Sequence, residues 1–169
     1  MSSISDAIQS KCLAFGDRVI KLNDYLLEQA SQKYDVGSKR YSVRNSKSSI
    51  SPQKSDISQP SSFKHHTSRV PVHLQSVAAL ANQLLRSGTS IGANNAEACN
   101  AISRQDFRSK SYIALKEARE SLYWIELLHR NNYLDEKQYN SIYADGEELV
   151  KILVARCKKL DEQLKEEKK

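Results

Sequence analysis

Long uncharged apolar runs are absent from this sequence of 169 residues, and no apolar stretch of signal-peptide type lies near its start. A membrane-spanning helix needs about 20 consecutive apolar residues, and a secretory signal needs a shorter apolar stretch behind its first residues. We therefore expect a cytoplasmic protein with no membrane partner.

Cysteine is also scarce, with three widely separated residues at Cys12, Cys99 and Cys157. Their odd number and spacing indicate neither a disulfide framework nor a metal site, so we interpret them as small core residues. No Ser/His/Asp or Cys/His arrangement is evident, and the adjacent His65 and His66 lack further metal ligands at a telling spacing. The sequence thus predicts a protein that is not an enzyme and holds no metal or cofactor.

Acidic residues are few in one segment. Lys33 to Pro71 has eight basic and two acidic residues, which accounts for the whole net charge of +6. The segment also holds all three prolines and eleven serines, and its apolar residues follow no clear period. Such a composition cannot offset its ordering entropy by burial. We predict a mobile or irregular basic connection over residues 35–70, within which residues 39–45 could form a short strand.

The remainder of the chain carries apolar residues at alternating spacings of three and four, which is the pattern of amphipathic helices. We predict helices over about 4–33, 72–102, 104–131 and 135–166, with Asp135 as the cap of the last one. Short turns between the later helices favour an antiparallel arrangement. The predicted fold is all-α, a single domain over 1–169 that forms an up-down four-helix bundle, with the long basic connection between helices 1 and 2.

The stretch RSGTSIGANNAEA looks like a loop by composition, but the apolar stripe of its helix passes through it in register. A phosphate-binding loop would need Lys and Ser or Thr after its last glycine, whereas Gly92 is followed by Ala93. We therefore place the stretch in the second helix. Small residues there would let a neighbouring backbone approach closely, from the same chain or from another subunit: Gly88, Gly92 and Ala96.

The predicted third helix has a second apolar face besides its core stripe, formed by Ile113, Trp124, Leu127 and Leu128. A helix in an isolated bundle needs one apolar face, so the second face predicts an interface with another subunit. The alternative is that Trp124 packs locally against the turn that follows.

Basic residues suggest a nucleic-acid partner. The third helix carries Arg104, Arg108, Lys116 and Arg119 with Tyr112 and Tyr123 between them, and the connection adds Lys39, Arg40, Arg44 and Lys47. Cations attract phosphate backbones without reading sequence, and tyrosines beside them can stack on unpaired bases. We predict nucleic-acid binding through these residues. The alternative is that the connection merely keeps the protein soluble.

The stretches QLLRSGTSIGANNAEA and SRQDFRSKSYIALKEARESLYWIELLHRNNYL closely resemble the four-helix-bundle proteins of the 23S ribosomal RNA intervening-sequence type. This resemblance covers Gln83 to Leu134 without a gap, and the first and last helices fit by position and periodicity. The family usually has a short linker between its first two helices, so the long basic connection is a departure.

The resemblance implies an up-down four-helix bundle that assembles into a ring, commonly a pentamer. Some members are encoded within sequences inserted in ribosomal RNA genes. Relatives with this fold serve as accessory variability determinants in diversity-generating retroelements, where they bind a reverse transcriptase and structured RNA. No enzymatic activity is established for the family.

Two hypotheses of function follow. In the first, the protein is a non-enzymatic ring that binds structured RNA as an accessory factor to a reverse transcriptase or another RNA-handling partner. In the second, it is a purely structural or protein-interaction module with no direct nucleic-acid role. An enzymatic reading has only the histidine pair, His65 and His66, in its favour.

Overall fold

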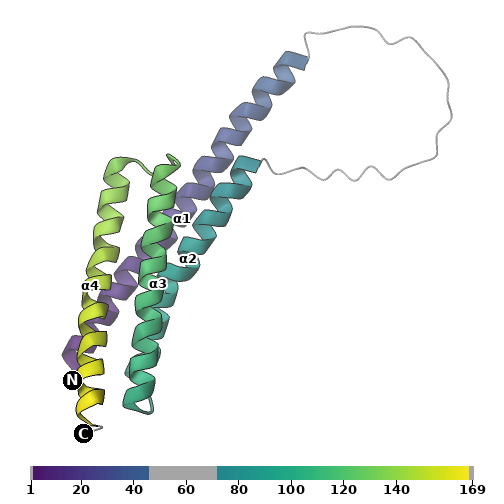
Figure 1. Cartoon of the computed structure of the whole chain (residues 1–169). Coiled ribbons are helices and arrows are strands. Elements are labelled where there is room, and N and C mark those ends of the chain that lie inside the picture. The colour runs from purple at the N-terminus through teal and green to yellow at the C-terminus, as the bar shows by residue number, and fades with distance from the viewer. Residues whose placement is uncertain (1, 46–71, 168–169) are drawn as a thin grey trace, which may run out of the picture.

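The computed structural model describes the backbone of residues 2–45 and 72–167 and the side chains of residues 5–32 and 75–167. The described backbone forms four helices and no strand: α1 Ser2–Asn45, α2 Val72–Cys99, α3 Arg104–Arg130 and α4 Glu136–Glu166. The helices run alternately up and down (Figure 1). This confirms the predicted all-α four-helix bundle. None of the described helices is long and apolar enough to cross a membrane.

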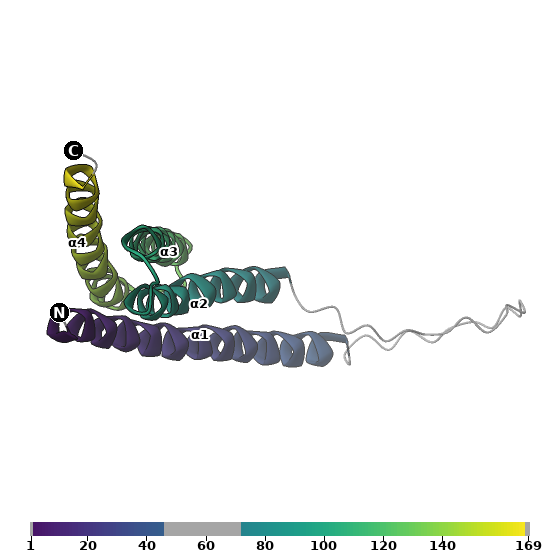
Figure 2. The same cartoon turned by 90° about the horizontal axis from the view of Figure 1, so that it is seen from below.

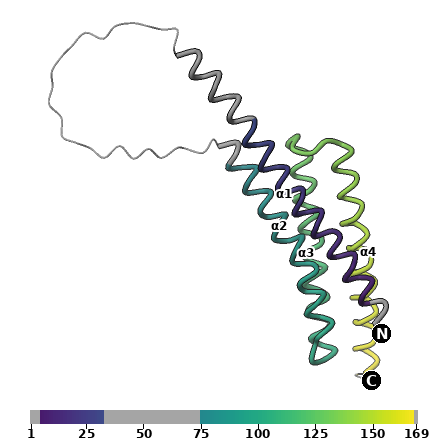
Figure 3. The backbone as a smooth tube through the Cα atoms, turned by 180° about the vertical axis from the view of Figure 1, so that it is seen from behind, coloured from purple at the N-terminus to yellow at the C-terminus, as the bar shows by residue number. Residues whose placement is uncertain are grey.

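Neighbours in the chain are also neighbours in the bundle. Helix α2 packs between α1 and α3, and α3 packs against α4, whereas the contact between α1 and α4 is the smallest. Seen from below, α3 and α4 lie to one side of the α1–α2 pair (Figure 2). Seen from behind, α1 runs obliquely from the C-terminal end of α4 towards α2 (Figure 3). The oblique course explains why α1 meets α4 over only part of its length.

The core consists of the apolar stripes that the spacing predicts. Phe15 and Val19 of α1, Ile91 of α2, Ile125 of α3 and Leu153 of α4 are all at most 1% exposed. Removing a large apolar side chain from water stabilises a fold by about 1.5–3 kcal/mol. Burial of the continuous apolar stripes therefore holds the four helices together, although most helical turns also carry polar residues on their outer side.

The glycines of RSGTSIGANNAEA lie against α1 of the same chain. A Cβ atom on Gly88 would lie 2.9 Å from Cγ2 of Val19, and one on Gly92 would lie 3.4 Å from Cβ of Cys12. Gly88 therefore packs closely against Val19 of α1 in the same chain. Ala96 is exposed in the protomer and takes no part in this contact.

Two helix ends differ from the sequence-based prediction. Helix α1 continues to Asn45, so the expected end near residue 33 and the possible strand over 39–45 are wrong. Extending an existing helix costs far less than starting one, so the helical backbone of α1 can continue where the sequence has no apolar stripe. Helix α2 ends at Cys99, and Ile102, expected in the core stripe, is 96% exposed in the turn. The connection predicted over residues 35–70 is therefore helical as far as Asn45, and its remaining residues, 46–70, lie outside the described residues.

The turn between α3 and α4 is short and well capped. Asp135 accepts a hydrogen bond from the backbone N–H of Gln138, whose side chain accepts one from the backbone N–H of Asp135. The predicted cap is therefore confirmed as a reciprocal capping box. His129 at the end of α3 stacks on Tyr139 of α4, with ring centroids 4.2 Å apart.

Candidate nucleic-acid interface

Arg108 joins α3 to α4 through an ion pair. Its Nε donates to Oδ1 of Asp161 at 2.6 Å, and the hydroxyl of Tyr112 donates to Oδ2 of the same carboxylate at 2.6 Å. The guanidinium carbon of Arg108 lies 4.8 Å from the centre of the Tyr112 ring. The hydrogen bonds from Tyr112 and Arg108 hold the pKa of Asp161 below its usual value. Arg108 therefore shares its charge with a carboxylate.

Arg104, the first residue of α3, is also paired, because its guanidinium contacts the carboxylate of Glu167 beyond the end of α4. Lys110 pairs in the same way with Glu97 of α2. Exposed pairs of this kind contribute little to stability, but they reduce the positive charge that the surface presents. Of the four basic residues predicted on α3, Arg104 and Arg108 are thus the less available for binding phosphate.

Lys116 and Arg119 are the basic residues of α3 whose charge is available for binding. Both are exposed, and neither has an ion pair with a described residue. They follow Tyr112 at one and two turns on the same side of α3, and Tyr123, which is 57% exposed, follows one turn later. The structure therefore presents a line along α3 in which two cations lie between two tyrosines.

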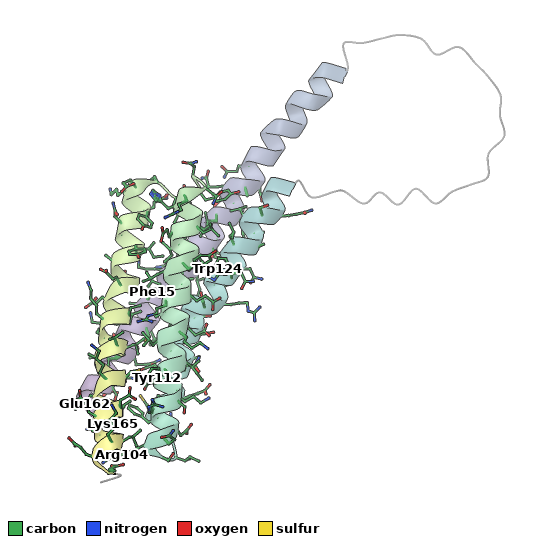
Figure 4. All side chains as sticks on the ribbon, viewed as in Figure 1. Phe15, Arg104, Tyr112, Trp124, Glu162 and Lys165 are labelled. Carbon is green, nitrogen blue, oxygen red and sulfur yellow. The ribbon has the colours of Figure 1, made fainter. Side chains whose placement is uncertain are left out.

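Helix α4 extends this line across the bundle. Lys158 and Lys165 are exposed and lie one turn before and one turn after Asp161, the residue that faces Tyr112. We name the combined surface the outer α3–α4 face and define it by Tyr112, Lys116, Arg119, Tyr123, Lys158 and Lys165. Tyr112 and Lys165 mark its position in Figure 4. Chemically, it offers point charges for phosphate groups and aromatic rings for stacking.

The basic residues predicted in the connection cannot be placed on this face. The backbone of Lys39, Arg40 and Arg44 belongs to the last turns of α1, but their side chains lie outside the described residues. Lys47 and the histidine pair also lie outside the described residues. Within the described part of the chain, no group of three potential metal ligands occurs.

The predicted apolar face of α3 needs one correction. Ile113 is 37% exposed, and Trp124 and Leu127 are partly buried. Leu128 is completely buried in the core, because it lies one turn after the buried Ile125. Trp124 also packs locally, since it adjoins the core and its Nε1 donates to Glu120 at 3.0 Å. A smaller exposed face thus remains.

A second apolar surface on α1 escaped the sequence analysis. Leu13 is 60% exposed and Ile20 is 44% exposed, and Leu27 is partly buried. They recur every seven residues, which aligns them along one side of the helix. The seven-residue spacing could have revealed them, but the core stripe of α1 already accounted for one apolar face.

A buried polar group also went unrecognised. Asn95 is a polar residue in the core stripe of α2, and it is completely buried. Its Nδ2 donates to Oε1 of Gln9 at 2.5 Å, and its Oδ1 accepts from Nη1 of Arg156 at 2.6 Å. Burial lowers the pKa of the Arg156 guanidinium. Spacing alone could not reveal this group, because its members come from three helices.

Comparison with known proteins agrees with the fold. Residues 63–155 match the model of the family described as 23S rRNA-intervening sequence protein. A crystal structure of a protein of unknown function from the S23 ribosomal protein family of Bacteroides thetaiotaomicron is 33% identical, with a TM-score of 0.61. The similarity covers 91% of this chain and 97% of that one. No curated protein matches the chain. Because the family match spans more than half of the sequence, the chain belongs to the family of 23S rRNA-intervening sequence proteins.

Proposed function

We propose that this protein is a non-enzymatic homo-oligomeric bundle that binds structured RNA through its outer α3–α4 face. The observation that carries the proposal is the pairing pattern of the basic residues. Lys116 and Arg119 are exposed and form no ion pair with a described carboxylate, and they lie beside the exposed ring of Tyr123. Cations supply salt-dependent affinity for the backbone, and a tyrosine adds stacking on unpaired bases.

The proposed oligomer is a ring, with five subunits as in the proteins that the sequence resembles. Its support in this chain is the presence of two exposed apolar surfaces, Leu13 and Ile20 on α1 and Ile113 on α3. Two different surfaces on one protomer permit a head-to-tail contact, which closes into a ring when the rotation is suitable. A ring repeats the outer α3–α4 face and raises the total affinity for RNA.

As a binding protein without catalytic chemistry, it would act as an accessory to an RNA-handling enzyme. We propose a reverse transcriptase of a diversity-generating retroelement as that partner, on the basis of the family resemblance. The ring would hold structured RNA in place for the enzyme. A reverse transcriptase gene with template and variable repeats beside this gene would support the assignment.

The test compares two double variants with the same change of charge. Lys116→Glu with Arg119→Glu alters the outer α3–α4 face, whereas Lys21→Glu with Lys137→Glu alters exposed lysines elsewhere. Fluorescence anisotropy with a structured RNA measures affinity at several salt concentrations. We expect the first double variant to bind at least about 10-fold more weakly and to reduce the salt slope by about two, and the control to change affinity little. Equal affinity for both variants would contradict the proposed face.

The exposed apolar stripe of α1 favours a second candidate, a module that contacts only protein. Leu13 and Ile20 would then bind a partner protein rather than another copy of the chain. Capture of partners from a nuclease-treated lysate separates the two candidates. Capture of a partner protein after nuclease treatment, together with no RNA affinity of this chain at low salt, would favour the module.

A further inference from the structure

A guanidinium group is held inside one end of the bundle. Arg156 of α4 donates from Nη1 to Oδ1 of Asn95 in α2 at 2.6 Å, and Asn95 donates to Gln9 of α1 at 2.5 Å. The ring of Phe107 in α3 lies 5.5 Å from Cζ of Arg156. Residues of all four helices therefore surround this group, near the beginning of α1 and α3 and near the end of α2.

No carboxylate among the described residues pairs with Arg156, in contrast to Arg18, Arg104 and Arg108. The ionisable groups that act on its charge are three thiols, those of Cys12, Cys99 and Cys157. Thiols do not supply the full charge of a carboxylate at neutral pH. A partly buried charge without a counter-ion lowers the stability of a fold, and a bound anion would remove that penalty.

The edge of the Arg156 guanidinium formed by Nε and Nη2 makes no hydrogen bond to the described protein. Nη1 contacts Asn95, whereas Nε and Nη2 have no hydrogen bond to a described residue. Among the described side chains, only Oγ of Ser111 is buried without a partner, so these two nitrogens reach solvent. Nε–H and Nη2–H point in parallel and match two oxygens of a phosphate group.

We infer that Arg156, positioned by Asn95 and backed by Phe107, is a binding site for a phosphate group. The group is supplied either by inorganic phosphate or by the backbone of RNA. The RNA form of the inference rests on the proposed function, but the site is separate from the outer α3–α4 face. Arg156 reaches towards α2, whereas Lys158 and Lys165 are exposed on α4.

The first test measures thermal unfolding of the full chain in sodium phosphate and in sodium chloride at equal ionic strength. We expect phosphate to raise the Tm of the wild-type protein in a saturable manner by about 2–4 °C. Arg156→Gln keeps an amide donor near Asn95 but loses the fork, and it should lose this rise. The matched control Arg119→Gln, at an exposed arginine, should keep it.

Arg156→Lys retains the charge without the fork and should also lose most of the rise, so it replaces Arg156→Gln if that variant does not fold. A wild-type protein with equal Tm in the two salts would overturn the inference, whatever the variants show. An undiminished rise in Arg156→Gln would overturn it as well.

RNA affinity identifies the source of the phosphate. If RNA supplies it, Arg156→Gln should weaken RNA binding about 3- to 10-fold, and inorganic phosphate should compete with RNA. If inorganic phosphate is the ligand, RNA affinity stays unchanged while the Tm rise is lost. Failure of the proposed function is distinguishable, because the double variant Lys116→Glu with Arg119→Glu should keep the phosphate-induced Tm rise in either case.

Discussion

A basic residue is available to bind phosphate only if no carboxylate of a neighbouring helix pairs with it. Arg108 and Arg119 lie on the same side of α3, three turns apart. Arg108 meets Asp161 of α4, but the α4 residue three turns before Asp161 is the apolar Val150. The same residue type therefore forms an interhelical ion pair at one level of the bundle and remains exposed at another.

Gly88 shows how closely α1 and α2 approach. A Cβ on Gly88 would lie 2.9 Å from Val19, and a longer side chain would force the helices apart. We expect Gly88→Leu to lower the free energy of unfolding by about 1–3 kcal/mol, measured by urea denaturation.

Gly16 provides the matched control. A Cβ on Gly16 would meet no atom within 4 Å, apart from its own helix backbone. Gly16→Ala should therefore raise the free energy of unfolding by up to about 1 kcal/mol through helix propensity. If Gly88→Leu were as stable as the wild type, the close contact with Val19 would not exist in solution.

The buried thiol of Cys12 should make the free energy of unfolding fall as pH rises above 9. Burial raises the pKa of its thiol from 9.0 to about 11, an effect that Arg156 partly opposes. Between these pH values the unfolded chain loses the proton while the folded protein keeps it. The stabilisation is therefore fully present below pH 9 and is lost as pH rises through 11, with an upper limit of about 3 kcal/mol.

Urea denaturation under reducing conditions from pH 8 to 11 measures this loss. Cys12→Ala should show a smaller decline of the free energy of unfolding than the wild type. Cys99→Ala, which replaces an exposed thiol, serves as the control and should keep the wild-type decline. Parallel curves for the wild type and Cys12→Ala would show that another group causes the decline.

At the scale of the element, packing and capping define the helices. Helix α1 keeps its helical backbone to Asn45 although its last part carries no apolar stripe. Helix α2 ends at Cys99, where the chain turns towards Ser103, the cap of α3. The ends of α3 and α4 at the other turn are set by hydrogen bonds within a few residues.

The α3–α4 turn gives a prediction at this scale. Asp135→Ala removes the hydrogen bond to the backbone N–H of Gln138 and should lower the free energy of unfolding by about 1 kcal/mol. Asp135→Ser retains a capping oxygen and should lose much less. Thermal or urea unfolding of both variants checks this difference, and an equal loss would mean that the carboxylate acts other than as a cap.

At the scale of the whole molecule, the four helices enclose one core, and among the described residues both α1 and α3 expose apolar side chains. One exposed surface lies on α1 at Leu13 and Ile20, and the other lies on α3 around Ile113. Both would be covered if one protomer placed its α1 surface against α3 of the next. Such an assembly adds apolar burial without changing the fold of the protomer.

The double variant Leu13→Glu with Ile20→Glu tests this assembly. We expect a smaller particle in light scattering after size exclusion, with unchanged helix content by circular dichroism, because both side chains are already exposed in the protomer. Ala14→Glu, at an exposed residue of α1, is the control and should keep the mass of the wild type. An unchanged mass of the double variant would remove α1 from the interface.

The sequence by itself determined the four helices, their core stripes and the cap at Asp135. These features depend on local spacing and on hydrogen bonds between near neighbours, which a sequence displays directly. The same holds for the position of Gly88 in the middle of α2, since its register follows from the flanking apolar residues.

Only the tertiary structure decided which residues the surface offers. The pairing of Arg108 with Asp161, the complete burial of Leu128 and the approach of Arg156 to Asn95 depend on which helix faces which, and at what level. Periodicity fixes the face of one helix but not the partner opposite it. Charges, exposed apolar surfaces and the proposed phosphate site therefore emerge only once the helices are packed.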